Sequence, residues 1–319
     1  MKYSFVVPIY NDAELANTFC LEFQEAFQSF LKTDTIKDVV ELIFVNDGSP
    51  NLNAMIVLGD ISANYKFVKI VELSRNFGQH IALSAGYANS AGEYVGMLNV
   101  DRQDPPSELI KLIVEIEKGE NDVVYGLVEK RETGFFNKLT SRWFNKTLNF
   151  LTQSKVPLNV ATIRIMNRKF VNAYNSLTEK SRYLPGLENW IGFSKGYVST
   201  LHQARKEGKS SYNFKKRVAM AVESIVSFSD FPLKVVVYFG VTISLAGFLL
   251  GIYLIITQLF FIDYQPGYSS TMVAIVFIGG IQILVIGLAS IYIGRILKEV
   301  QNRPLYIIKN KINFAAGND

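Results

Sequence analysis

Carboxylate and amide side chains follow three short apolar segments in the N-terminal third of the chain. The three pairs are Asn11 and Asp12, Asn46 and Asp47, and Asn99 and Asp101. Oxygen atoms of such side chains bind ribose hydroxyls, base edges and hard cations. Each pair alone is also an ordinary turn sequence. Their repetition after successive segments favours a site for a nucleotide and a metal ion.

Two of these segments suggest specific contacts. Asp47 precedes Gly48, whose lack of a side chain allows close backbone approach, so we expect Asp47 to accept hydrogen bonds from a base or ribose. Asp101 and Gln103 are two residues apart, and on an extended segment their side chains would face the same side. Both would then offer oxygen ligands to Mg²⁺ or Mn²⁺.

Alternating strand and helix patterns must position these residues. Strands are predicted at 3–8, 41–46, 68–73, 94–99 and 122–126, and helices at 13–31, 52–64, 80–90 and 106–118. This alternation is typical of a doubly wound α/β fold with a mainly parallel sheet. Such sheets bind ligands at the carboxyl ends of their strands. The acidic and amide residues are predicted at those ends.

Two apolar runs, 235–262 and 271–293, occupy much of the C-terminal third. Each exceeds the roughly 20 residues that cross a bilayer as a helix. The link between them carries no Lys or Arg. Basic residues flank the pair on both sides: Lys215, Lys216, Arg217 and Lys234 before it, and Arg295, Lys298, Arg303, Lys309 and Lys311 after it. The positive-inside rule therefore predicts two membrane helices with both termini in the cytoplasm. Buried helices of a large soluble core are the alternative.

The division of the chain follows from these runs. We expect a catalytic domain at 1–212, an amphipathic interfacial segment at 213–232, two transmembrane helices at 233–298 and a cytoplasmic tail at 299–319. The net charge is +5, and much of the positive excess lies beside the membrane, where anionic lipids attract Lys and Arg. It requires no nucleic acid partner. Cys20 is the only cysteine, which excludes an intramolecular disulfide.

Several segments together resemble the successive motifs of family 2 glycosyltransferases with the GT-A fold. These are residues 8–12, 45–49 (Val-Asn-Asp-Gly-Ser), 73–78 (Leu-Ser-Arg-Asn-Phe-Gly) and 101–106. The chain is most similar to the branch that transfers sugars to polyprenyl phosphates. Further matches to that branch are Arg205, Gly208, Ser210, Tyr212, Tyr292, Ile293, Gly294, Arg295, Glu299, Arg303, Pro304 and Tyr306.

The resemblance implies inverting transfer of one sugar from a nucleotide-diphosphate sugar to polyprenyl phosphate. The acceptor in a bacterium would be undecaprenyl phosphate at the inner leaflet of the plasma membrane, with Mg²⁺ or Mn²⁺ assisting. Relatives form oligomers, so a homo-oligomer is implied, with a tetramer as the expected size. The implied residues are Pro8, Tyr10, Asn11, Asp12, Asp47, Arg75 and Asn99 for the nucleotide, Asp101 and Arg205 for catalysis, Asp101 and Gln103 for the metal, and Arg164, Arg205, Ser210 and Tyr212 for the acceptor or diphosphate.

Three departures from the branch pattern affect this expectation. Asn99 stands where the branch has Asp, residues 159–164 lack the carboxylates of the Asp-x-Gly-Asp-Phe-Arg pattern, and Ser211 stands where relatives commonly have Lys. The second change removes a catalytic base. An acceptor phosphate needs no base, because its second pKa of about 6 leaves it mostly a dianion at neutral pH.

Two other functions fit the same residues. A catalytically weak paralogue would bind a nucleotide sugar or act as a membrane scaffold, and another enzyme would transfer the sugar to a different membrane or protein acceptor. Neither the sugar nor the nucleotide base follows from the sequence, because both depend on the shape of the pocket.

Overall fold

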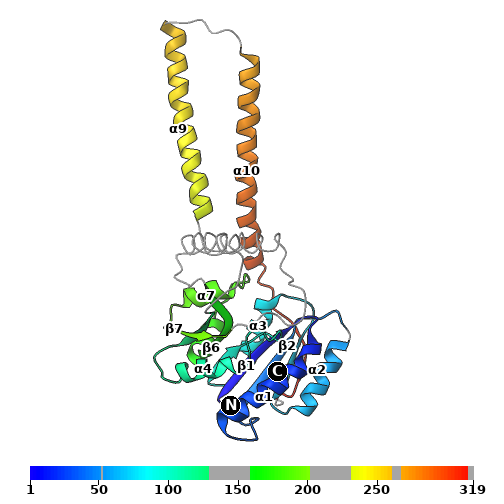
Figure 1. The fold of residues 1–319 in the computed structure, drawn as a ribbon. Coiled ribbons are helices and arrows are strands. Elements are labelled where there is room, and N and C mark those ends of the chain that lie inside the picture. The colour runs from blue at the N-terminus through cyan, green and yellow to red at the C-terminus, as the bar shows by residue number, and fades with distance from the viewer. Residues whose placement is uncertain (52, 129–158, 202–230, 261–266, 315–319) are drawn as a thin grey trace. The chain divides into compact units, whose positions relative to one another are not determined.

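The computed structural model describes residues 1–51, 53–128, 159–201, 231–260 and 267–314 (Figure 1). The chain forms two compact units. The first combines Met1–Arg217 with Pro304–Asp319, and the second is Val218–Arg303. Residues from Pro304 onward, which follow the second apolar helix in the chain, therefore belong to the same unit as the N-terminal domain.

The first unit is built on one mixed sheet with the strand order β7-β5-β6-β4-β1-β2-β3-β8. Its strands are β1 (Tyr3–Ile9), β2 (Val40–Asn46), β3 (Val68–Leu73), β4 (Tyr94–Met97), β5 (Val123–Val128), β6 (Val160–Asn167), β7 (Lys195–Thr200) and β8 (Ile308–Ile312). β1 pairs in parallel with β2 and β4, and β2 with β3. β6 and β8 run antiparallel to their neighbours. The prediction of a mainly parallel sheet is confirmed.

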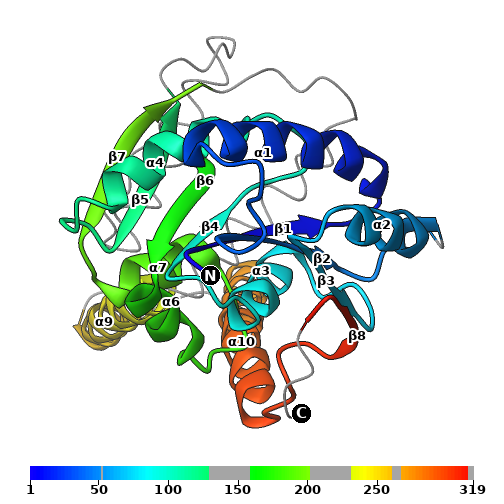
Figure 2. The same cartoon turned by 90° about the horizontal axis from the view of Figure 1, so that it is seen from below.

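Helices cover both faces of this sheet (Figure 2). They are α1 (Ala16–Leu31), α2 (Asn53–Asn64), α3 (Gln79–Ala88), α4 (Glu108–Ile116), α6 (Arg168–Asn175) and α7 (Leu184–Ile191). On one face, Phe23 and Phe27 of α1 pack on Phe5 of β1, with ring centroids 5.4 and 5.0 Å away. On the other face, Gly86 of α3 lies so close to Val6 that an added Cβ would come within 2.2 Å of it. Because successive side chains of a strand point to opposite faces of the sheet, the strands contribute to one hydrophobic core on each face.

The strand and helix predictions agree with the structure over the first 128 residues except at a few ends. β4 stops at Met97, two residues before the predicted end, and a 3-10 turn at Ala13–Leu15 precedes α1. The alternation did not predict β6, β7 and β8. Of these, β6 and β8 pair antiparallel to their neighbours, outside the repeating strand-helix-strand pattern.

The second unit contains α9 (Phe231–Phe260) and α10 (Tyr268–Val300). Within the described residues, one segment, Phe277–Val300, is long and apolar enough to cross a membrane, and Val235–Leu250 is a shorter apolar stretch. The predicted crossing of the bilayer by two helices therefore stays a prediction.

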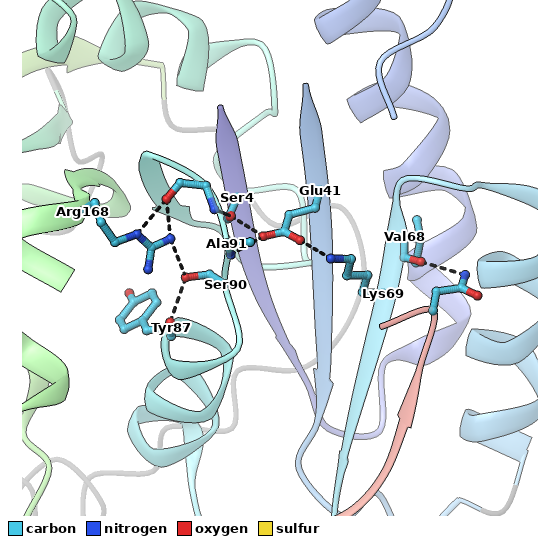
Figure 3. A network of polar contacts seen from close by, with 10 residues as sticks. Ser4, Glu41, Val68, Lys69, Tyr87, Ser90, Ala91 and Arg168 are labelled. Carbon is cyan, nitrogen blue, oxygen red and sulfur yellow. Dashed lines mark hydrogen bonds and ion pairs between the residues drawn. The ribbon is translucent and has the colours of Figure 1, made fainter. Parts of the chain in front are cut away.

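A buried carboxylate joins the amino ends of the central strands (Figure 3). Glu41 of β2 is fully buried. It accepts hydrogen bonds from Ser4 Oγ at 2.5 Å, Lys69 Nζ at 2.5 Å and Ala91 N at 2.6 Å. Burial alone would raise the pKa of Glu41. The hydrogen bonds from Lys69, Ser4 and Ala91 lower it by more than burial raises it, so the pKa is below its usual value. The network ties β1, β2, β3 and the turn before β4 together.

Glu41→Gln is expected to destabilise the fold by about 3 kcal/mol, because Lys69 loses its partner in a buried site. A lowered carboxyl pKa contributes stability above the unfolded pKa, and this contribution is lost as the pH falls through the folded pKa. The free energy of unfolding of the variant should therefore fall less steeply as the pH is lowered. Urea unfolding between pH 3 and 7 measures both effects.

Glu115→Gln is the matched control, because Glu115 pairs with exposed Lys118 within one helix turn. Surface pairs of this kind contribute little. Equal destabilisation by the two substitutions would contradict the role assigned to Glu41.

Candidate functional site

The carboxyl ends of β1 and β2 are joined by backbone and side-chain hydrogen bonds. Asp47 N donates to Ile9 O at 2.9 Å, and Asn11 N donates to Ser49 Oγ at 3.2 Å. Asn46 Oδ1 accepts from both Ser49 N and Ser49 Oγ. Asn11 has φ 67, a left-handed conformation that is uncommon outside glycine. The two loops thus form one fixed surface at this edge of the sheet.

Asp47 holds the next loop in place. We call residues 74–78, between β3 and α3, the β3–α3 loop. Asp47 Oδ1 accepts from Phe77 N at 2.7 Å, and Oδ2 accepts from Gly78 N at 2.9 Å. Gly48, at φ +60, lies against the same loop, where an added Cβ would be 2.3 Å from the Arg75 carbonyl carbon. The loop is therefore packed directly on the end of β2.

The buried position of Asp47 gives this carboxylate a structural role in addition to the expected nucleotide contact. Burial raises its pKa, and the amides of Phe77 and Gly78 and the charge of Arg75 only partly offset that rise. The carboxylate that we expect to contact the nucleotide thus already accepts one loop amide on each oxygen. Arg75, also expected at the nucleotide, is exposed, with its guanidinium carbon 4.2 Å from the centroid of the Phe77 ring. Asp47 fixes the loop that carries Arg75.

The end of β4 continues this surface. Gln79 Nε2, at the start of α3, donates to Asn99 Oδ1 at 3.1 Å. Asp101 Oδ1 accepts from Gln103 N at 3.2 Å, and Arg102 between them has φ 60. The extended conformation predicted for 101–103 is therefore wrong, because the left-handed residue forms a turn there. Arg102 instead pairs with Glu22 of α1.

The oxygen-bearing side chains at the end of β4 fit a Mg²⁺-type site with few protein ligands. In the described part of the chain, no three His, Cys, Asp or Glu side chains cluster as a metal cage. Mg²⁺ keeps several waters and is commonly bound by one or two carboxylates together with substrate phosphates. Asp101, with the amide oxygens of Asn99 and Gln103 nearby in the chain, matches that donor set.

The remaining predicted nucleotide residues lie on β1 and just beyond it. Pro8 is within β1, opposite Val45. Tyr10 is exposed, and its N–H donates to Asp12 Oδ1 at 2.9 Å. Asp12 therefore shapes the same turn as Asn11. Arg205, Ser210 and Tyr212 lie outside the described residues.

Arg164 is buried on β6 and paired with an acid that the sequence analysis did not identify. Its Nη1 is 2.5 Å from Glu188 Oε2 on α7. The Tyr125 hydroxyl donates to the same oxygen at 3.0 Å, while Glu188 Oε1 has no hydrogen-bond partner among the described residues. The charge of Arg164 also affects His80. The pKa of His80 is lowered to about 4, mainly because the imidazole is buried and also because the positive charge of Arg164 disfavours its protonated form. Glu188 could have been noticed as an acid within the apolar stretch Leu184–Ile191.

Two family models match the chain. The model described as glycosyl transferase family 2 matches residues 4–174, more than half of the chain. The chain belongs to glycosyl transferase family 2. A second model, described as the GtrB C-terminal hairpin, matches residues 231–296. Family membership makes the chain a glycosyltransferase, and the sheet described above is its GT-A-like α/β domain.

Full-length relatives share about a third of the residues. An uncharacterised glycosyltransferase of Synechocystis is 36% identical, covering 97% of this chain and 95% of the relative. A prophage-derived bactoprenol glucosyl transferase of Shigella flexneri is 35% identical, covering 97% and 98%. Among solved structures, glucosyl-3-phosphoglycerate synthase from Mycobacterium tuberculosis with Mn²⁺, UDP-glucose and phosphoglyceric acid has a TM-score of 0.49 and 17% identity, covering 70% of this chain and 77% of that one.

Glu188→Gln is expected to destabilise the catalytic unit by about 3 kcal/mol, because Arg164 would keep a buried charge without its counterion. Thermal and urea unfolding of the detergent-purified protein measure this loss. The double variant Arg164→Met, Glu188→Leu removes both charges and should recover most of the stability. A double variant less stable than Glu188→Gln would show that the two residues do not act as a pair.

Proposed function

We propose that this glycosyltransferase moves one sugar from a nucleotide-diphosphate sugar to polyprenyl phosphate, with undecaprenyl phosphate as the bacterial acceptor. The observation that carries the proposal is full-length similarity to a bactoprenol glucosyl transferase, together with the continuous surface formed at the ends of β1, β2 and β4. Hydrogen bonds fix the loops that carry Tyr10, Asn11, Arg75 and Asn99.

The acceptor supplies its own nucleophile. A phosphate monoester is mostly a dianion at neutral pH, so its oxygen attacks the anomeric carbon without prior loss of a proton. One direct displacement inverts that carbon and releases the nucleoside diphosphate. The enzyme's task is then to align donor and acceptor and to stabilise the charge on the leaving diphosphate. This chemistry fits a chain whose 159–164 segment has lost its carboxylates.

Asp101 and Gln103 are the residues that would hold Mg²⁺ or Mn²⁺, with Asn99 beside them. A bound divalent cation would stabilise the negative charge of the diphosphate. We assign acceptor or diphosphate contacts to Arg205, Ser210 and Tyr212. Arg164 remains a candidate for the same role, although its charge is balanced by Glu188.

We further propose a multi-pass protein of the plasma membrane with its catalytic unit and both termini in the cytoplasm. Residues 1–212 form the catalytic domain together with β8, 213–232 lie along the inner leaflet, 233–298 contain two membrane helices, and 299–319 return to the cytoplasm. The hairpin family match over 231–296 supports the two-helix arrangement. A homo-oligomer, with a tetramer as the expected size, would assemble through the membrane helices, where Gly279, Gly280 and Gly287 permit close approach.

Asp101→Ala is expected to lower kcat by at least about 100-fold, because the leaving diphosphate would lose its charge stabilisation. The assay follows lipid-linked product from detergent-purified protein, undecaprenyl phosphate, Mg²⁺ or Mn²⁺ and a panel of nucleotide sugars. Nucleotide binding by the unaltered protein without product from any donor would support the scaffolding alternative. Turnover only with another acceptor would support a different transfer reaction.

Asn99→Asp is expected to lower the cation concentration that gives half-maximal rate by about fivefold, because it adds a second carboxylate beside Asp101. The Gln79 bond to Asn99 needs only an acceptor oxygen and is retained. Gln79→Ala removes that bond without adding charge and serves as the control. An unchanged cation requirement in Asn99→Asp would argue against a metal at the end of β4.

A cysteine introduced at Gly267 is expected to react with a membrane-impermeant maleimide added outside intact cells, whereas one at Asn302 should react only after lysis. Cys20 is fully buried, so the background is low. Labelling of both positions from outside, or of neither, would contradict the proposed topology.

A further inference from the structure

Strand β8 follows the second apolar helix in the chain, yet it completes the sheet of the catalytic unit. Ile308–Ile312 pairs antiparallel with β3, with Leu73 opposite Ile308 and Ile70 opposite Ile312. β3 therefore has a neighbour on both sides, β2 and β8. A segment that looks like a tail in the sequence is a structural strand.

Side chains fasten β8 at both ends. Lys309 Nζ lies 2.6 Å from Glu72 Oε1 on β3. Asn313 Nδ2 donates to Ser62 O at the end of α2, at 2.8 Å, and to Val68 O at the start of β3, at 3.0 Å. Asn313 is left-handed, with φ 63, a conformation that asparagine adopts more readily than most other residues with a side chain. These bonds hold the strand along the full length of β3.

The approach to β8 reaches the candidate site. Ser74 N, at the first residue of the β3–α3 loop, donates to Ile307 O at 2.9 Å. The other end of that loop is held by Asp47 through Phe77 and Gly78. The loop is thus anchored from two sides, by the end of β2 and by the segment that enters β8. Arg75, the expected nucleotide contact, lies between the two anchors.

We propose that residues 304–313 position the β3–α3 loop for the nucleotide of the donor, so that the chain beyond the membrane helices is part of the donor-binding machinery. This inference rests on the proposed sugar-transfer function. The segment acts through Ser74 and β3 and is a positioning element. Loosening β8 should let the loop leave its binding geometry, which raises donor KM and leaves the chemical step nearly unchanged.

Asn313→Gly in the full-length protein tests the proposal. Glycine accepts the left-handed backbone and removes only the two side-chain hydrogen bonds. Donor KM is expected to rise about fivefold to tenfold, while kcat stays within about twofold, since two bonds of this kind contribute modestly. Hydrogen exchange at the amides of residues 75–78 should accelerate about tenfold.

Ser194→Ala is the matched control at the opposite edge of the sheet. It also removes two hydrogen bonds, both between Ser194 Oγ and Asp122. It should alter neither donor KM nor exchange in the β3–α3 loop.

Separate results distinguish the inference from the function on which it rests. Faster exchange in β8 with unchanged exchange at 75–78, or a change in kcat alone, would overturn the positioning role. Absence of turnover in the unaltered protein with every donor would refute the proposed function. In that case, two measurements on Asn313→Gly still test the positioning role. They are the affinity for UDP and GDP, measured by calorimetry, and hydrogen exchange at the loop amides.

Discussion

The carboxylate of Asp47 organises the end of the sheet where the candidate site lies. A buried carboxylate is costly unless its oxygens are hydrogen-bonded, and here each oxygen receives a backbone amide of the β3–α3 loop. The arrangement requires Gly48 next to it, because any side chain there would collide with the loop backbone. The Asp-Gly pair therefore fixes the position of Arg75 relative to the ends of β1 and β2. The hydrogen bonds of Ser49 with Asn11 and of Gln79 with Asn99 extend the same fixed surface.

The two ends of the central strands differ in how their polar side chains are satisfied. At the amino ends, Glu41 is fully buried and satisfied by three donors from separate segments, an arrangement that stabilises the fold. At the carboxyl ends, Asn11 and Arg102 adopt left-handed conformations that cost free energy in residues other than glycine. In the described part of the chain, Lys32, Asn302 and Asn313 also have positive φ, so such conformations occur elsewhere as well. The buried Glu41 network and the candidate site thus lie at opposite ends of the strands.

The first five strands and the helices between them could be predicted from the sequence, because their apolar patterns repeat in a regular order. It also placed Asn11, Asp47 and Asn99 at strand ends, since parallel strands bring their carboxyl ends together. It failed at Asp101–Gln103, where the left-handed Arg102 turns the chain. It also missed the Arg164–Glu188 pair, because no local pattern links two residues that are 24 positions apart in the sequence. The charged pattern Ile-Lys-Asn-Lys-Ile of β8 concealed an edge strand, since edge strands commonly carry lysines.

The place of β8 in the sheet has a consequence for synthesis. Residues 308–312 leave the ribosome after the apolar helices at 231–260 and 268–300, so the sheet of the catalytic unit stays one strand short while those helices are being made. Until then the outer side of β3 carries unpaired backbone groups, and such edges invite pairing with other chains. The last strand closes that edge once the hydrophobic segments have been released. Maturation of the catalytic domain is thereby ordered after synthesis of the helices.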